Sequence, residues 1–194
     1  LRTTNEWSGL SRYSLSMGHE MSVTSLQLAA AFSAIGNRGI RMKPAIIERI
    51  ETPGGATVRP FSPVALGRMI PEEHAAILLR YMEGVVKGGT GTLAAPVYYT
   101  AAGKTGTSKK FSASWGGYSD SVISSFIGLV PASDPVLCIL IVVDDPADRM
   151  SGGSAAAPLF SHIADRSLAV MGVKNRPLNL GKGSLGRSRP RSFS

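Results

Sequence analysis

Apolar residues recur at helical spacing in three stretches of this 194-residue chain. In 22–39, Thr24 followed three residues later by Gln27 forms the pattern of a capping box, and apolar side chains then repeat every three or four positions. A second helix is predicted over 71–89, where a proline and two glutamates suit a helix N-terminus. A third helix is predicted over 152–173.

Between the last two helices the pattern changes to one that is typical of strands. Three strands are predicted, over 97–108, 119–131 and 135–146, and a short hairpin loop joins the last two. A separate strand over 40–55 is predicted to run into a Pro-Gly turn. Antiparallel strands flanked by helices predict an α+β fold, and the hairpin connection argues against a parallel, doubly wound sheet.

The charge is unevenly distributed. The formal net charge is +8, but the segment 174–194 holds six Lys or Arg and no acidic residue, which leaves fifteen basic against thirteen acidic residues, a net of +2, over 1–173. This balance argues against nucleic acid as a partner. We interpret 174–194 as a basic tail and expect it to be disordered, with contact to an anionic lipid or polymer as the alternative.

Other features exclude several classes of protein. A hydrophobic content of 43% with 18% charged residues is typical of a globular chain. The longest apolar run, 135–143, suits a buried strand and is too short to span a bilayer. The single cysteine, Cys138, lies within that run and is interpreted as a buried apolar residue. No metal-spaced Cys/His cluster is present, so no metal or other cofactor is predicted.

The stretch TAAGKTGTSKK, residues 100–110, is the strongest candidate for chemistry. Gly103 and Gly106 weaken a strand, and such glycines are tolerated where something must approach the backbone closely. An ideal pleat puts the side chains of Thr105 and Thr107 on one face and that of the preceding lysine, Lys104, on the other. The pattern therefore indicates a strand that lines a site.

The residue types in this stretch suit an anionic, extended ligand. Lys104 offers a positive charge to an anion. The backbone N–H of Thr107 would donate to a developing oxyanion if the strand edge is open. Gly106 would let an extended peptide lie close to the main chain and add as a further strand.

The order of several stretches resembles the C-terminal half of the transpeptidase domain of class B penicillin-binding proteins, of the cell-division or elongation type. In chain order they are MSVTSLQLAAAFSAIGNRG, GVVKGGTGTLA, AAGKTGTS, SSFIGLVPASDPVLCILIVVDDP and GGSAAAPLFSHIA, within roughly residues 16 to 172. The resemblance implies part of the penicillin-binding protein and β-lactamase-like transpeptidase fold, with an antiparallel sheet flanked by helices.

The resemblance also implies an activity. In the family, a serine attacks the carbonyl between two D-alanines of a peptidoglycan stem peptide, and a neighbouring stem then takes the acyl group. β-Lactams mimic the D-Ala-D-Ala end and trap the acyl state. Lys104 and Thr107 are implied to be catalytic, through the charge of the lysine and the oxyanion-hole N–H of Thr107. Thr105, Gly106 and Thr107 are implied to bind substrate, with both threonine hydroxyls on its terminal carboxylate.

Two family motifs are absent from the chain. No serine stands three residues before a lysine, and none stands two residues before an asparagine. The resemblance therefore places the nucleophile and the second motif upstream of Leu1, and the chain alone is expected to be inactive. Two alternatives stay open: a non-catalytic protein that binds stem peptides or division partners, and a β-lactamase or β-lactam sensor on the same fold.

The implied partners and location follow from the family alone. They are the stem peptide, β-lactams, the N-terminal half of the same domain, and a polytopic membrane glycosyltransferase. The expected location is the extracytoplasmic, periplasmic face of the bacterial inner membrane.

Overall fold

The computed structural model describes residues 3–112, 116–147 and 150–174. The helices and strands, in chain order, are η1 (Thr4–Glu6), α1 (Ser11–Ser16), α2 (Ser25–Gly36), β1 (Ile40–Met42), β2 (Arg49–Glu51), β3 (Thr57–Pro60), β4 (Ala65–Arg68), α3 (Glu72–Gly88), η2 (Thr92–Ala94), β5 (Ala102–Ser112), β6 (Gly117–Val130), β7 (Leu137–Asp144), α4 (Gly152–Ala155) and α5 (Ala157–Val170). Helices with antiparallel sheets confirm the α+β prediction.

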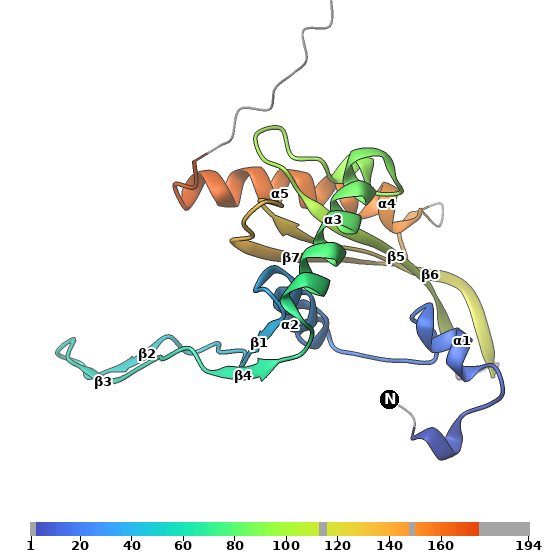
Figure 1. The fold of residues 1–194 in the computed structure, drawn as a ribbon, viewed down its shortest axis with the longest axis horizontal. Coiled ribbons are helices and arrows are strands. Elements are labelled where there is room, and N and C mark those ends of the chain that lie inside the picture. The colour runs from blue at the N-terminus through green and yellow to red at the C-terminus, as the bar shows by residue number, and fades with distance from the viewer. Residues whose placement is uncertain (1–2, 113–115, 148–149, 175–194) are drawn as a thin grey trace, which may run out of the picture.

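A three-stranded antiparallel sheet forms the centre of the fold, in the order β5–β6–β7 (Figure 1). Its register pairs Thr105 with Phe126 and Phe126 with Ile141. Among the described strands, β5 and β7 are therefore the two edges. Helices lie on both faces of this sheet, α5 on one side and α2 with α3 on the other (Figure 1).

The face toward α5, called here the α5 side, is closed by a continuous apolar core. Phe160 and Leu168 of α5 are fully buried and belong to one cluster with Phe126 and Val130 of β6. The rings of Phe126 and Phe160 lie 4.9 Å apart between centroids. Alternation along β6 sends every second side chain into this core, which fixes the strand register.

The opposite face, called here the α2 side, has a smaller core. Met82 of α3 is buried there against Ala102 of β5 and Leu129 of β6. Phe32 of α2 and Cys138 of β7 are only half-buried against this cluster. Helix α2 begins as the sequence predicts, because the Thr24 hydroxyl accepts from the Gln27 N–H and the Gln27 side chain accepts from the Thr24 N–H.

A two-part hairpin, called here the arm, projects away from the sheet (Figure 1). Strand β1 pairs with β4 and β2 pairs with β3, both antiparallel. Every residue of β2 and β3 is exposed. The single strand predicted over 40–55 is wrong, because it is divided into β1 and β2, with Pro44 in the gap where a ladder N–H would be needed.

The helix predicted over 71–89 is confirmed as α3, and the strands predicted over 119–131 and 135–146 are confirmed as β6 and β7. The predicted helix 152–173 is divided at Ala156 into α4 and α5. Pro158 stands in the first turn of α5. Proline has no N–H to continue the hydrogen bonds of a preceding helix, but an N–H in a first turn needs no partner, so a new helix begins here.

The strand predicted over 97–108 begins later and extends further, as β5. The N–H groups of Val97 and Tyr98 donate to the Asp165 carboxylate of α5, at 2.8 and 3.2 Å, so this segment is bonded to a helix. At the other end, the rings of Phe111 and Tyr118 meet edge to face across β5 and β6 and extend the hairpin.

The basic tail predicted to be disordered lies outside the described residues, except for Lys174. Within the described ranges, no helix combines the length and the apolar character needed to cross a bilayer.

Candidate functional site

The segment Lys104–Thr107 lies in the first half of β5, at the edge of the sheet. Lys104 and Thr107 are exposed, whereas Thr105 and Gly106 are half-buried. The register continues through this segment without interruption, because its bulge comes later, after Lys109. The four residues are therefore held as regular strand while one side of the strand stays open.

The two threonines lie on the α5 side, and each hydroxyl has a fixed neighbour. The Thr107 hydroxyl accepts a hydrogen bond from the N–H of Gly152, at 3.1 Å. The Thr105 hydroxyl lies 2.9 Å from the hydroxyl of Thr90, in the short loop between α3 and η2. Both hydroxyl oxygens are thereby held in place by groups from other parts of the chain.

Two glycines make this close approach possible. A Cβ atom on Gly152 would collide with the carbonyl oxygens of Gly106 and Ser125, and one on Gly153 would collide with the carbonyl oxygen of Thr90. Helix α4 can therefore begin directly against the backbone of β5 and β6 only with glycine at these positions.

A buried serine anchors the segment that leads into α4. Ser124 of β6 is fully buried, and its hydroxyl donates to the carbonyl of Met150. Because a buried hydroxyl without a partner is costly, this bond fixes residues 150–152 against the sheet. The N–H of Gly152 is consequently aimed at the Thr107 hydroxyl.

Lys104 lies on the α2 side, as the pleat predicts. Its ammonium folds back along its own strand and donates to the carbonyl of Thr105, at 2.9 Å. Farther along β5, Lys110 forms an ion pair with Asp144 of β7, with Nζ 2.8 Å from the carboxylate oxygen. That hydrogen bond raises the pKa of Lys110 by stabilising its ammonium form. Lys104 makes no ion pair within the described residues, so its charge is available to a ligand.

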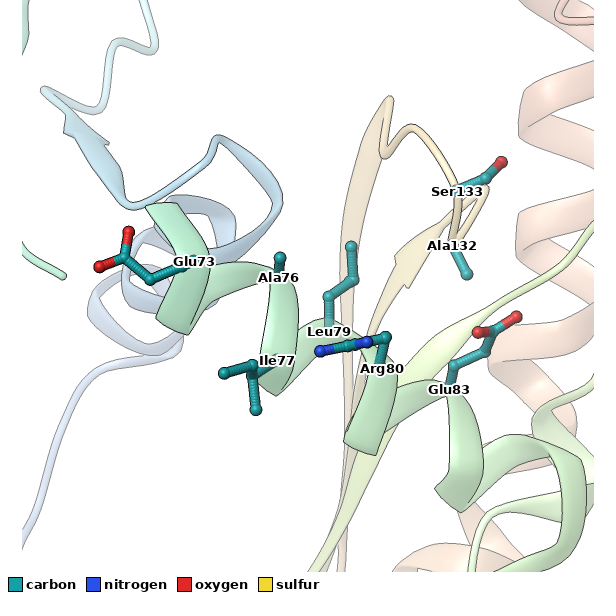
Figure 2. A pocket seen from close by; sticks show the side chains of 8 residues that line it. All are labelled: Glu73, Ala76, Ile77, Leu79, Arg80, Glu83, Ala132 and Ser133. Atoms are coloured by element: carbon teal, nitrogen blue, oxygen red, sulfur yellow. The ribbon is translucent and has the colours of Figure 1, made fainter. Parts of the chain in front are cut away.

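Two hollows lie elsewhere on the α2 side. One, of about 560 Å³, is formed by α3 and the turn after β6; Figure 2 shows Glu73, Arg80 and Glu83 along the helix, with Ser133 across from it. The other, of about 620 Å³, lies between α2, the start of the arm and the β6–β7 hairpin. Lys104–Thr107 line neither, so this segment is an exposed edge and not the floor of either hollow.

The penicillin binding protein transpeptidase domain family matches residues 2–165 of the chain. The chain belongs to this family. The resemblance predicted from the ordered motifs is thereby confirmed.

Individual relatives agree with this assignment. The penicillin-binding protein PbpB of Mycolicibacterium smegmatis is 38% identical over 170 residues, which cover 82% of this chain and 26% of that protein. The peptidoglycan D,D-transpeptidase FtsI of Escherichia coli K12 is 34% identical, covering 94% of this chain and 31% of that protein. The chain thus spans about a quarter to a third of the length of these relatives.

Solved structures of family members have the same fold. The crystal structure of penicillin-binding protein 3 from Mycobacterium tuberculosis complexed with ampicillin matches with a TM-score of 0.81 and 31% identity, over 92% of this chain and 42% of that one. The transpeptidase domain of penicillin-binding protein 3 from Burkholderia pseudomallei matches with a TM-score of 0.74 and 27% identity, over 91% of this chain and 51% of that one. The predicted transpeptidase fold is confirmed.

Sequence reasoning found the strand that carries the candidate site but missed the residues that support it. Thr90, Gly152, Gly153 and Ser124 all contact the segment or hold what contacts it. The sequence carries a partial signal for three of them, since Thr90 stands between two glycines and the Gly152–Gly153 pair opens a predicted helix where glycine is otherwise unfavourable. Ser124 carries no such signal, because serines are common in exposed strands.

Proposed function

We propose that this chain is the C-terminal part of a D,D-transpeptidase domain that cross-links peptidoglycan stem peptides through an acyl-serine intermediate. The observation that carries the proposal is the open edge of β5, where two hydroxyls with fixed neighbours flank Gly106 beside Lys104, which makes no ion pair among the described residues. The nucleophilic serine and the second motif are supplied by a preceding part of the protein.

Each residue of the segment has one role in this proposal. Lys104 supplies positive charge and assists proton movement near the second motif. The hydroxyls of Thr105 and Thr107 bind the terminal carboxylate of the stem peptide or the carboxylate of a β-lactam. Gly106 leaves room for the substrate along the strand, and the N–H of Thr107 completes the oxyanion hole. No metal or other cofactor takes part.

The same proposal includes the domain, the partners and the cellular location of the chain. Residues 1–173 belong to the transpeptidase domain and pack against its N-terminal half, and 174–194 form the tail. The domain acts at the extracytoplasmic, periplasmic face of the bacterial inner membrane, beside a polytopic membrane glycosyltransferase. The family membership, the small net charge of +2 over 1–173 and the names of the relatives support this setting.

Covalent labelling by a fluorescent penicillin tests the proposal. Protein made from the complete reading frame is expected to be labelled, and Lys104→Ala is expected to lower the acylation rate by about a hundredfold or more, as loss of a preorganised charge or donor does in comparable sites. Lys109→Ala is the matched control, because Lys109 is an exposed lysine on the same strand.

Three results would contradict the proposal. Equal labelling of the Lys104→Ala and Lys109→Ala proteins would remove Lys104 from the site. A reading frame with no S-x-x-K motif before Leu1 would instead favour the non-catalytic alternative. Rapid turnover of nitrocefin would favour the β-lactamase alternative.

A further inference from the structure

The loop between α3 and η2 presents one side chain to the candidate site. Thr90 is exposed and lies between two glycines whose N–H groups both donate to the carbonyl of Val85, each at 3.1 Å. A Cβ atom on Gly91 would press against Phe126 and Val85, and one on Gly89 would press against the backbone of Val85. This loop is therefore a tight, well-defined structure that ends α3 and fixes the position of Thr90.

The hydroxyl of Thr90 has one hydrogen-bond partner among the described residues, the hydroxyl of Thr105 at 2.9 Å. A hydroxyl can donate one proton and accept at two lone pairs. If Thr105 donated to Thr90, its proton would be used within the protein. If Thr90 donates, the proton of Thr105 is left for a ligand.

For the neighbouring Thr107 there is no ambiguity: its hydroxyl accepts from the protein and keeps its own proton for a ligand. The Thr107 oxygen accepts from a backbone N–H, that of Gly152, and an N–H can only donate. The proton of Thr107 is thus free to point toward solvent, where this side chain is exposed. Thr105 lies on the same face of the same strand, two residues away.

We propose that Thr90 is a positioning residue that makes Thr105 a hydrogen-bond donor to an anionic ligand. This inference rests on the proposed function, which places a carboxylate in front of Thr105 and Thr107. With an anion present, the proton of Thr105 turns toward it and the proton of Thr90 turns toward Thr105. Hydrogen bonds in such a chain polarise and strengthen one another.

The proposed arrangement makes the site favour a charged ligand over a neutral one. Two hydroxyls whose oxygens already accept from the protein side are both left with a proton to offer on the ligand side. A carboxylate accepts two such protons, whereas an ester or amide at the same place offers weaker acceptors. The ligand class is therefore an anion with at least two acceptor oxygens, and Thr90 contributes to its selection from behind Thr105.

The test compares two ligands and several variants of the protein made from its complete reading frame. The ligands are a fluorescent penicillin and its methyl ester, in which the anion is masked. Thr90→Val removes the hydroxyl and keeps the shape, and Thr90→Ser restores the hydroxyl. Thr92→Val is the matched control, because Thr92 is an exposed threonine two residues farther on whose hydroxyl has no partner within the described residues.

With the free acid, Thr90→Val is expected to weaken the initial non-covalent complex roughly tenfold, as loss of support for a hydrogen bond to a charged group does, and to leave the rate of acylation of the bound ligand nearly unchanged. With the ester, Thr90→Val and the unchanged protein are expected to react alike. Thr90→Ser and Thr92→Val are expected to match the unchanged protein with both ligands. In a Thr105→Val background, Thr90→Val is expected to have no further effect.

An equal loss with acid and ester, or a full additional loss in the Thr105→Val background, would overturn the inference, because Thr90 would then act only on the general structure. No loss with the acid would overturn it as well. Lys104→Ala separates this from failure of the proposed function: if that variant loses labelling while Thr90→Val does not, the inference alone fails, and if Lys104→Ala keeps full labelling, the proposed function fails.

Discussion

The two sides of the central sheet differ in how completely they are covered. On the α5 side, Phe160 and Leu168 are fully buried in one core with the sheet. On the α2 side, helix α2 is poorly covered: Ala34 is its one buried residue, and its Leu26 is 52% exposed. The closed side therefore supplies most of the burial that stabilises the fold, while the other side leaves apolar surface open.

Strand β5 lies between these two environments and divides its chemistry accordingly. Thr105 and Thr107 are on the closed side, where neighbouring segments fix their hydroxyls. Lys104 is on the open side, where its ammonium donates to a carbonyl of its own strand. The rigid side thus carries the groups that need exact orientation, and the open side carries a charge that acts over a longer range.

The largest expected effect comes from removing an aromatic ring on the closed side. Phe160→Ala is expected to lower the free energy of unfolding by about 3–5 kcal/mol, because it leaves a cavity next to Phe126 in a fully buried core. Phe32→Ala, on the open side, removes the same ring from a half-buried position and is expected to cost clearly less. Urea denaturation followed by circular dichroism measures both. Equal losses would break the comparison between the two sides.

The next effect sharpens the comparison at the site itself. Gly152→Ala puts a Cβ atom against the backbone of β5 and β6 and is expected to cost about 1–3 kcal/mol of stability and to slow acylation. Gly84→Ala is the control, because nothing lies within 4 Å of the added Cβ and alanine favours the helix. That control is expected to be neutral or stabilising by up to about 1 kcal/mol. A Gly152→Ala protein as stable and as active as the unchanged one would contradict the close packing described here.

A smaller effect is expected at the start of α2, on the open side. Thr24→Ala removes the hydroxyl that accepts from the Gln27 N–H and is expected to cost about 1 kcal/mol. Thr24→Ser keeps the cap and is the control. Thermal unfolding measures the difference. No change would mean that α2 is held by the sheet alone and that its cap contributes nothing.

The smallest effect concerns Cys138, whose pKa is raised from its ordinary 9.0 because burial disfavours the thiolate. The folded state then holds its proton at a pH where the unfolded state has lost it. Stability is expected to be independent of this group below about pH 9 and to fall as pH rises above it. Cys138→Ala is expected to remove that part of the pH dependence, which urea denaturation at pH 8 and pH 10 measures. An unchanged slope would show that the α2 side leaves this thiol open to solvent.

Periodicity predicts those elements that pack against the sheet. Helix α3 buries one face, and the sequence shows it as a regular apolar repeat. Strands β6 and β7 are covered on both faces, and the sequence shows them as apolar runs. Strands β3 and β4 were not predicted, because every one of their residues is exposed and no alternation marks them. The break at Ala156 was missed because small residues on both sides continue the helical pattern, and only Pro158 marks the new start.

Only the part of the candidate site that lies on strand β5 was predictable from the sequence. The glycines and threonines of 103–107 mark an unusual strand by their types alone. Thr90 and Gly152 act on it from 15 and 45 residues away, as their bonds to Thr105 and Thr107 show. Such contacts depend on how α3 and α4 are placed against the sheet, which no local pattern in the chain specifies.

Gly103 of β5 stands opposite Gly128 of β6 in the register, and aromatic rings occupy the space that two side chains would otherwise take: Phe126 lies where a Cβ atom of Gly103 would be, and Phe160 where one of Gly128 would be. The distance between the strand of the site and the last helix is thereby set by ring thickness. Substitutions in α5 that alter the position of Phe160 would therefore shift the strand that carries the candidate site without contacting that site.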